Sequence, residues 1–316
     1  MKRIGIIGAS GYTGIELIKY LEPHSDIQLV CLNSETSSGI PVRELWPECK
    51  SNFTFTNYSF EQINDLLPDL VFLAMHDGFS RLALQKLKCK IIDLSRDLRF
   101  SREAIYGLPE LNRQQIKSAH LIANPGCYAT ACILSSLPLI RYEFAERIIF
   151  DCKSGYSGAG RKPSYNNDPR NYIENLIPYK ISSHPHRAEI QKHLGFHAVS
   201  FTPHVLPLFR GIMCTSHIIL KNIMHPEELF AIYKEFYQKE PFVKISNRLP
   251  ELHCTQNTNL CCIGGFEIDD TNQLVIITTL DNLCKGASTQ AIQNMNLMLG
   301  FKETEGLIGY ETLAKK

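Results

Sequence analysis

The chain has 316 residues, of which 44% are hydrophobic, and at roughly 150 residues per domain this length predicts two domains with full cores. Lys and Arg number 33 against 32 Asp and Glu, so the net charge of +1 provides no field that favours nucleic acid or an anionic membrane surface. No segment approaches the ~18 consecutive apolar residues of a membrane span. We therefore expect a small-molecule partner, with neither nucleic acid nor a membrane involved.

The eleven cysteines are scattered and form no Cys-x-x-Cys pair, which predicts neither a disulfide framework nor a zinc cluster. We expect reduced thiols and no bound metal. The first residues, MKRIGIIGASGYTG, lead into a strand and a glycine-rich turn, without the apolar region and cleavage site of a signal peptide. These observations favour the cytoplasm.

Up to about residue 150, short β-branched runs alternate with helical periods, a pattern typical of βαβ units around a parallel sheet. A third helix, apolar throughout, is expected to start at Tyr128 and to end near Pro138. The predicted strands of this region cover residues 3–7, 27–32, 69–74, 90–93 and 121–123, and the first two helices cover 13–22 and 80–87.

After residue 148 the predicted strands are longer, such as 212–220 and 274–280, with one amphipathic helix at 226–238. Such strands with few helices between them predict an antiparallel sheet in an α+β domain. The last helix, 287–299, is expected to pack back on the first domain. The fold class is therefore α/β, with a dinucleotide-binding domain of residues 1–147 plus 285–316 and a substrate and dimerisation domain of residues 148–284.

Three glycines, Gly8, Gly11 and Gly14, lie between the first strand and the first helix. At this position glycines permit a tight turn and a close approach of the backbone to a pyrophosphate at a helix N-terminus. The spacing G-x-x-G-x-x-G departs from the usual G-x-G-x-x-G, but the flanking strand and helix are those of a dinucleotide site. We expect a nicotinamide dinucleotide cofactor here.

The second strand is followed by Asn33 and Ser34, where an NAD site usually has a carboxylate for the ribose 2′-hydroxyl. This difference favours NADP. The hydroxyl groups of Ser34, Thr36 and Ser37 can donate to a 2′-phosphate, although Glu35 would repel one if it pointed inward. An ordinary polar loop remains nearly as good an interpretation of these contacts.

The segment ANPGCYAT places Cys127 after a strand and an Asn-Pro-Gly turn, where an apolar helix begins. The unpaired N–H groups and the dipole of a helix N-terminus stabilise a thiolate and make the sulfur nucleophilic. We interpret Cys127 as a nucleophile and the other ten cysteines as small buried apolar residues.

Six motifs in this order resemble those of the longer type of N-acetyl-gamma-glutamyl-phosphate reductase: GASGYTG, NPGCYAT, SGYSGAGRK, HPHRAEI, PHVLPLFRGI and KGASTQAIQNMN. The match runs from Gly8 to Gly300. The resemblance implies a Rossmann-type NADP-binding domain and a glyceraldehyde-phosphate-dehydrogenase-like catalytic and dimerisation domain, as in aspartate-semialdehyde dehydrogenases. It also implies a homo-oligomer, either a dimer or a tetramer. Ala188 and the stretch KGASTQA depart from the commoner motifs without removing a functional group.

The resemblance assigns roles to further residues. It places Ser10, Tyr12 and Thr13, with the three glycines, on the NADP phosphates. DLSRDLRF resembles a family motif that would put Arg99 near the substrate phosphate, a role suited to a guanidinium. The loop from Ser157 and Gly158 to Gly160 would border cofactor and substrate, and Asn282 would approach the nicotinamide.

The implied reaction is NADPH-dependent reduction of N-acetyl-L-glutamyl 5-phosphate to the 5-semialdehyde with release of phosphate, in arginine biosynthesis. Cys127 would displace phosphate to give a thioester, which hydride then reduces. His184 and His186 are the candidate acid and base. A strand would send them to opposite faces and a helix turn would splay them apart, so which of them moves the proton is open.

His204 and Arg210 are candidates for holding the substrate carboxylate or phosphate, with packing or ion pairing equally good explanations. Three alternative functions stay open. One is aspartate-semialdehyde dehydrogenase, whose cysteine motif usually lacks the Pro-Gly. Another is a LysW-dependent aminoadipyl-phosphate reductase, whose substrate is attached to a carrier protein. The third is an NADP-binding sensor without catalytic activity.

Overall fold

The computed structural model describes residues 1–172 and 174–307 and divides the chain into two compact units. Unit 1 contains Met1–Pro125 and the described residues from Ala287 onwards, and unit 2 contains Gly126–Gly286. The first division lies earlier in the chain than the predicted boundary after residue 147, because the intervening helix packs on the sheet of unit 2. The predicted tail beyond residue 307 lies outside the described residues.

Unit 1 contains a parallel sheet with the strand order β2-β1-β3-β4-β6-β5. The five predicted strands are present, with bounds that differ by at most one residue, and β5 is an addition. The strand order reverses direction at β1, which is the position where open α/β sheets bind ligands. The strands are β1 Lys2–Ile7, β2 Ile27–Asn33, β3 Leu70–Leu73, β4 Lys90–Asp93, β5 Ile105–Tyr106 and β6 Leu121–Ala123.

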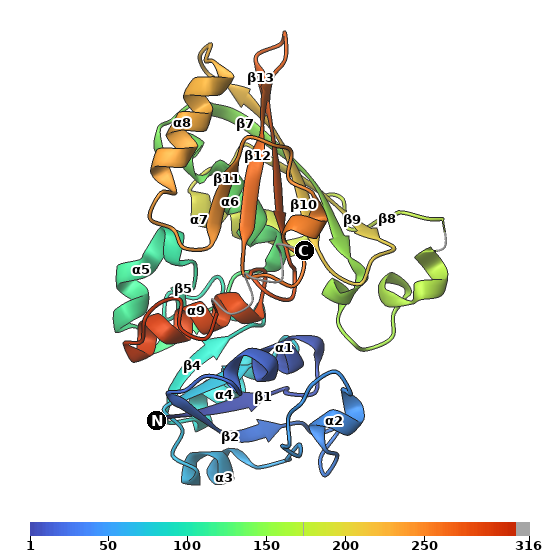
Figure 1. Cartoon of the computed structure of the whole chain (residues 1–316), viewed down its shortest axis with the longest axis vertical. Helices are drawn as coiled ribbons and strands as arrows, with labels where there is room; N and C mark the ends of the chain where they lie inside the picture. Colours follow the sequence, from blue (N-terminus) through green and yellow to red (C-terminus); the bar gives the residue numbers. More distant parts are fainter. Residues whose placement is uncertain (173, 308–316) are drawn as a thin grey trace. The chain divides into compact units, whose positions relative to one another are not determined.

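The helices of unit 1 connect these strands, and the last of them returns from the far end of the sequence. This helix, α9, packs against α1, α5 and β4, as expected for the last helix (Figure 1). A capping box formed by Ser59 and Gln62 starts α3, and Gly300 in the left-handed conformation ends α9. The helices are α1 Tyr12–Leu21, α2 Val42–Leu45, α3 Phe60–Asp65, α4 Phe79–Lys86, α5 Pro109–Ser118 and α9 Ser288–Leu299.

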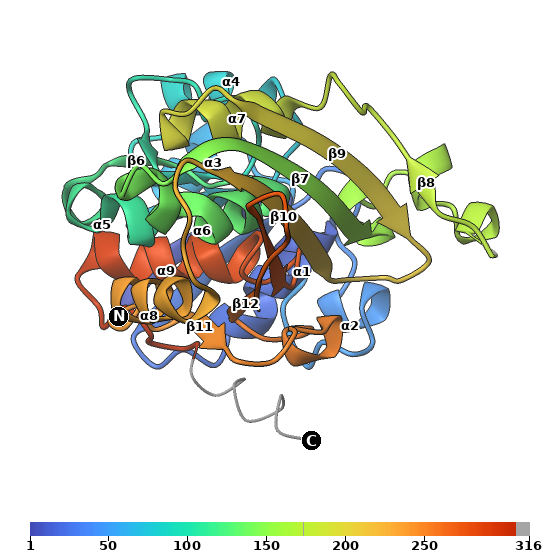
Figure 2. The same ribbon diagram turned by 90° about the horizontal axis from the view of Figure 1, so that it is seen from above.

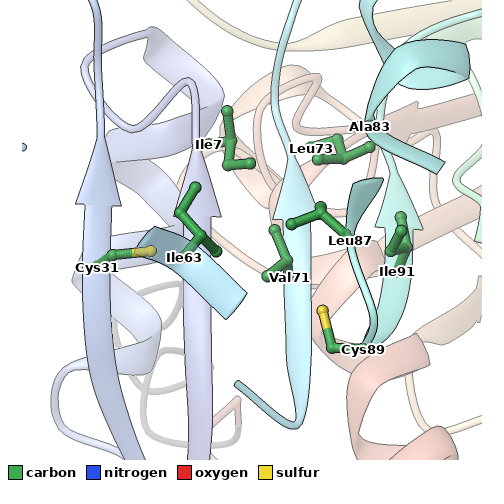
Figure 3. Close-up of a cluster of buried hydrophobic side chains, with 9 residues drawn as sticks. All are labelled: Ile7, Cys31, Ile63, Val71, Leu73, Ala83, Leu87, Cys89 and Ile91. Atoms are coloured by element: carbon green, nitrogen blue, oxygen red, sulfur yellow. The ribbon is translucent and has the colours of Figure 1, made fainter. Parts of the chain in front are cut away.

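One hydrophobic core of unit 1 lies between its sheet and the helices α3 and α4 (Figure 3). Val71 and Leu73 of β3 are fully buried there, together with Ile63 of α3 and Ala83 of α4. Fully burying each large aliphatic side chain contributes about 1.5–3 kcal/mol, so this core fixes the sheet whose loops carry the candidate cofactor residues.

Unit 2 contains a seven-stranded sheet with the order β11-β12-β13-β10-β7-β9-β8. The predicted antiparallel arrangement is wrong in part: β7 pairs with β9 in parallel and β11 pairs with β12 in parallel, so the sheet is mixed. The parallel pairing of β7 and β9 requires a crossover, and the connection between them contains the helix α7. The strands are β7 Ala145–Gly155, β8 Ile177–Pro178, β9 Val199–Leu206, β10 Ile212–Leu220, β11 Val243–Ser246, β12 Cys261–Ile268 and β13 Gln273–Leu280.

Buried and half-exposed residues alternate along β9 and β10, which lie beside β7 in a curved sheet (Figure 2). The buried face is covered by α6, which contacts β7, β10 and β13, while α8 packs on β11 and β12. The α-helices are α6 Cys127–Arg141, α7 Pro185–Leu194 and α8 Pro226–Phe236, and the short 3-10 helices are η1 Tyr156–Ala159, η2 Tyr165–Asn167, η3 Pro169–Tyr172 and η4 Leu252–Cys254.

The helix α6 continues through Pro138 to Arg141, although the sequence predicted an end near the proline. Proline lacks the N–H that would donate to the carbonyl of Leu134, four residues earlier. The hydroxyl of Tyr237 donates to this carbonyl instead, at 2.6 Å, and the hydroxyl of Tyr233 donates to the Ser135 carbonyl at 2.5 Å. Two buried tyrosines therefore satisfy backbone acceptors beside the proline, and the helix persists.

Within the described part of the chain, no helix combines the length and the apolar character that a membrane span requires.

Candidate active site

Cys127 is the first residue of α6, and Gly126 precedes it as the N-cap residue in an extended conformation. The thiol is partly exposed, whereas nine of the other ten cysteines are buried and Cys254 is exposed. The loop before α9 packs directly on Cys127, since a Cβ atom on Gly286 would lie 2.8 Å from the Cβ atom of Cys127. The predicted nucleophile thus sits at a helix start, where the helix dipole favours a negative charge.

The two histidines lie together, and the predicted splaying of their rings is wrong. His184 is the N-cap residue of α7, and its Nδ1 accepts the backbone N–H of His186 at 3.2 Å. The ring centroids are 4.7 Å apart. Because His184 lies just before the helix, its ring folds back over the first turn. Its neutral form then carries the proton on Nε2.

A buried carboxylate connects His186 with the nucleophile turn. Glu189 is 1% exposed, and its Oε1 accepts the backbone N–H of Gly126 at 2.8 Å. Its Oε2 lies 4.0 Å from Nε2 of His186, one helical turn earlier. A negative charge at this distance stabilises a positively charged imidazole. The sequence analysis missed Glu189, although its position three residues after His186 in a helix starting at Pro185 was the available signal.

The rings of two tyrosines pack against the histidines. The Tyr128 ring lies 5.8 Å from the ring of His184 and 5.8 Å from that of His186, and the Tyr179 ring lies 5.4 Å from His184. Tyr128 donates its hydroxyl proton to the His204 carbonyl at 3.0 Å, and the Tyr179 hydroxyl lies 3.5 Å from that of Tyr128. Burial raises the pKa of both tyrosines, so both stay protonated at neutral pH and act by packing and hydrogen bonding.

Three predicted cofactor residues of unit 2 form one cluster. The side-chain amide of Asn282 donates to the Ser157 hydroxyl at 2.9 Å and accepts the N–H of Gly211 at 2.7 Å. A Cβ atom on Gly158 would lie 3.8 Å from the amide nitrogen of Asn282. Gly286 is packed against both Asn282 and Cys127, so this cluster adjoins the nucleophile.

The predicted substrate residues His204 and Arg210 each lie beside an acidic side chain. Nδ1 of His204 is 3.3 Å from a carboxylate oxygen of Asp151, on the sheet face opposite α6. Nε of Arg210 is 3.3 Å from a carboxylate oxygen of Asp281, which is fully buried. The same Asp281 accepts the N–H groups of Leu283, Cys284 and Asn257. Their substrate roles stay predictions, and each side chain contacts a carboxylate of unit 2.

The glycine turn of unit 1 has the geometry that a dinucleotide site needs. Gly8 has a φ angle of +86°, and a Cβ atom there would lie 2.3 Å from the carbonyl oxygen of Ala74, after β3. Only glycine fits this position. Gly11 is the N-cap residue of α1, whose first turn contains Tyr12, Thr13 and Gly14. The Ser10 hydroxyl bonds to the Ser34 hydroxyl at 2.7 Å, which joins the turn to the end of β2.

A cavity of about 150 Å³ adjoins this turn, and Gly8, Asn33, Ser34 and Glu35 are part of its lining. Ser37 is buried but is not part of the lining. The cavity opens at the ends of β1 and β2, where the ribose of a dinucleotide is expected. These residues therefore fit a nicotinamide dinucleotide, and Glu35 is the one acidic side chain in the lining.

Arg99 is a buried cation in unit 1, 7% exposed. Its Nε donates to the Asn124 carbonyl at 3.0 Å and its Nη2 donates to the Leu94 carbonyl at 3.2 Å. The loop that carries it is fixed by Asp93, which accepts the hydroxyls of Ser80 at 2.6 Å and Ser95 at 2.9 Å. Burial raises the pKa of Asp93. Two backbone carbonyls thus orient the guanidinium, which also lies close enough to Asp93 to lower the pKa of that carboxyl.

Comparisons with known proteins agree with this arrangement. The family model described as "Semialdehyde dehydrogenase, NAD binding domain" matches residues 3–119, and the model described as "Semialdehyde dehydrogenase, dimerisation domain" matches residues 127–282. Aspartate semialdehyde dehydrogenase II from Vibrio cholerae, complexed with ASA, has a TM-score of 0.76 at 17% identity over 95% of this chain and 98% of that chain. The fold and the site define a dehydrogenase of the semialdehyde dehydrogenase class.

More similar relatives specify the family. N-acetyl-gamma-glutamyl-phosphate reductase from Methanocaldococcus jannaschii is 43% identical over 97% of this chain and 98% of its own length. The protein of the same name from Methanosphaera stadtmanae is 42% identical over 96% of both chains. The chain belongs to the family of N-acetyl-gamma-glutamyl-phosphate reductases. Aspartate semialdehyde dehydrogenase with NADP from Candida albicans, at 14% identity over 94% of this chain and 98% of that chain with a TM-score of 0.74, shares the fold alone.

Proposed function

We propose that the chain catalyses the NADPH-dependent reduction of N-acetyl-L-glutamyl 5-phosphate to N-acetyl-L-glutamate 5-semialdehyde, with release of phosphate, in arginine biosynthesis. The observation that carries the chemistry is the connection of Cys127, through the Gly126 N–H and buried Glu189, to His186. The choice of acyl group rests on the names of the relatives.

In the first step, His186 takes the proton of the Cys127 thiol, and the negative charge of Glu189 stabilises the imidazolium that forms. The thiolate sulfur attacks the acyl carbon, and a tetrahedral oxyanion forms. We assign the stabilisation of this oxyanion to the N–H groups at the start of α6 and to the Nε2–H of His184. Phosphate then leaves as the thioester on Cys127 forms, and we assign the binding of that phosphate to Arg99.

The second step is reduction of this thioester, for which NADPH, when bound, would supply the hydride. The imidazolium of His186 stabilises the thiohemiacetal oxyanion that results by donating a hydrogen bond, and it keeps its proton. Collapse of this intermediate breaks the carbon–sulfur bond, returns the thiolate to Cys127 and releases the aldehyde. Tyr128 packs against both imidazoles and limits their movement during these transfers.

We assign NADP as the cofactor because Asn33 and Ser34 take the place of a carboxylate at the end of β2. Gly8, Ser10, Gly11, Tyr12, Thr13 and Gly14 would hold the phosphates, with Ser34 and Ser37 near the 2′-phosphate and Ser157, Gly158 and Asn282 near the nicotinamide. The exposed side chain of Glu35 can turn to solvent, which removes its repulsion.

We further propose a homodimer formed by unit 2, acting in the cytoplasm. The sheet face opposite α6 presents half-buried apolar side chains, among them Met213, Ile219, Val275 and Ile277. Such a face is suited to a symmetric interface. Met213→Asp is expected to give a monomer by sedimentation.

The eleven free cysteines are consistent with a reducing compartment.

The reverse reaction tests the function most directly. With purified protein, phosphate-dependent reduction of NADP is measured with N-acetylglutamate semialdehyde, with aspartate semialdehyde and with the aminoadipate homologue. We expect the N-acetylglutamate compound to give the highest kcat/KM. Preference for aspartate semialdehyde would overturn the assignment of the acyl group, and no activity with any aldehyde would favour a sensor.

A further inference from the structure

Three cysteines that the proposed reaction does not use meet in the core of unit 2. Cys132 lies on α6, Cys152 on β7 and Cys214 on β10, and none of them has exposed surface. The sulfur of Cys132 is 3.7 Å from each of the other two sulfurs, and all three lie within 4.8 Å of one another. The sequence, which separates these cysteines widely, predicted no metal site, but the fold brings them together.

The three sulfurs have the spacing of ligands around a single ion. A point equidistant from them lies about 2.1–2.4 Å from each sulfur, close to the ~2.3 Å of a zinc–thiolate bond. Cys152 and Cys214 are directly paired in the antiparallel ladder of β7 and β10, and Cys132 faces them from a helix. Ligands on such rigid elements hold their geometry without the ion.

The number of ligands decides which ion fits. Structural zinc is almost always bound by four ligands, and among the described residues no fourth histidine, cysteine or carboxylate joins the group. Soft thiolate ligands also select monovalent copper, which accepts three sulfur ligands in one plane. We propose that Cys132, Cys152 and Cys214 form a binding site for one monovalent copper ion.

The surroundings of this thiol triad are compatible with a bound ion. The Ser216 hydroxyl lies 3.6 Å from the sulfur of Cys214 and 2.8 Å from the Ser135 hydroxyl, so it can turn its proton to a thiolate. A thiol that binds copper loses its S–H proton to solvent, and copper keeps its oxidation state.

The test compares metal content in matched variants. The protein is produced in copper-supplemented cells in a Cys127→Ser, Cys254→Ser background, which removes the two accessible thiols, and is purified anaerobically with a competing copper(I) chelator. We expect native mass spectrometry to show one copper per chain, and X-ray absorption to show three sulfur ligands. Cys132→Ala, Cys152→Ala and Cys214→Ala should each lower the copper affinity at least about tenfold.

The matched control is Cys261→Ala, which removes an equally buried cysteine on β12 of the same sheet. It should retain the copper, and copper should raise the thermal unfolding temperature of the control but not of the triad variants. Circular dichroism of the metal-free forms shows whether each variant is folded, and any single triad variant that folds is sufficient. Copper-free protein from the supplemented cells, or equal copper in the control and the triad variants, would overturn the proposal.

Discussion

The two units assemble their candidate site residues in different ways. In unit 1, the residues lie in loops that follow parallel strands: the glycine turn follows β1, and Ser34 follows β2. In unit 2, the interacting partners are distant in the sequence: Glu189 lies 63 positions after Gly126, and Asn282 lies 125 positions after Ser157. A substitution in unit 1 should therefore change cofactor binding independently of the other site residues. A substitution in unit 2 should change activity through the residue that the substituted side chain contacts.

Substitution of the nucleophile should have the largest effect on activity, and it should change the chemistry of unit 2 without changing the cofactor binding of unit 1. Cys127→Ser should lower kcat by about a thousandfold or more, because a serine hydroxyl at this position lacks the acidity of a thiol. Binding of NADPH should persist. Fluorescence of Trp46, the single tryptophan, measures that binding because its ring lies 5.7 Å from Tyr12 in the turn.

Cys254→Ser is the control, since it removes an exposed thiol elsewhere in unit 2. It should keep full turnover. Near-native turnover of Cys127→Ser would contradict the thioester mechanism. If Cys127→Ser lost NADPH binding together with turnover, the substitution would disturb more than the nucleophile.

The second prediction tests whether Glu189 acts through His186. His186→Ala should lower kcat by roughly a hundredfold to a thousandfold, more than His184→Ala, because only His186 lies beside a buried carboxylate. Glu189→Gln keeps an acceptor for the Gly126 N–H but removes the charge, and should cost about tenfold to a hundredfold in kcat.

The double variant gives the decisive comparison. If Glu189 acts through the imidazole, His186→Ala with Glu189→Gln should lose no more activity than His186→Ala alone. Additive losses would mean that Glu189 acts only by fixing the Gly126 turn. A larger loss for His184→Ala than for His186→Ala would reverse the assignment of the base.

The third prediction addresses unit 1 and is smaller. Ser34→Asp places a carboxylate at the end of β2, where it should repel a 2′-phosphate and accept the ribose hydroxyl of NAD. We expect kcat/KM for NADPH to fall about tenfold to a hundredfold while that for NADH holds or rises. Ser38→Asp, on an exposed residue of the same loop, is the charge-matched control. If Ser34→Asp left the preference for NADPH over NADH unchanged, Ser34 would not contact the 2′-phosphate.

The same contrast explains what the sequence could predict. Strands β1 to β4 and β6 were predicted closely, because buried parallel strands read as short β-branched runs between glycine turns. The positions of Cys127 and the glycine turn followed from local context alone. The helix α7, which begins at Pro185 directly after His184, was not predicted, because its few apolar residues give no clear period, and Glu189 was missed with it. The thiol triad depends on the pairing of β7 and β10, which no local pattern reports.

The smallest predicted effect concerns the helix that begins at the nucleophile. Tyr237→Phe removes the donor to the Leu134 carbonyl and should lower the free energy of unfolding by about 1–2 kcal/mol, because that buried acceptor loses its partner. Pro138→Ala restores a backbone N–H to the same carbonyl, so Tyr237→Phe should cost less in that background. Urea unfolding of the four proteins measures the difference. An equal cost in both backgrounds would mean that Tyr237 stabilises unit 2 by packing. The continuation of α6 beyond Pro138 would then not depend on the Tyr237 hydroxyl.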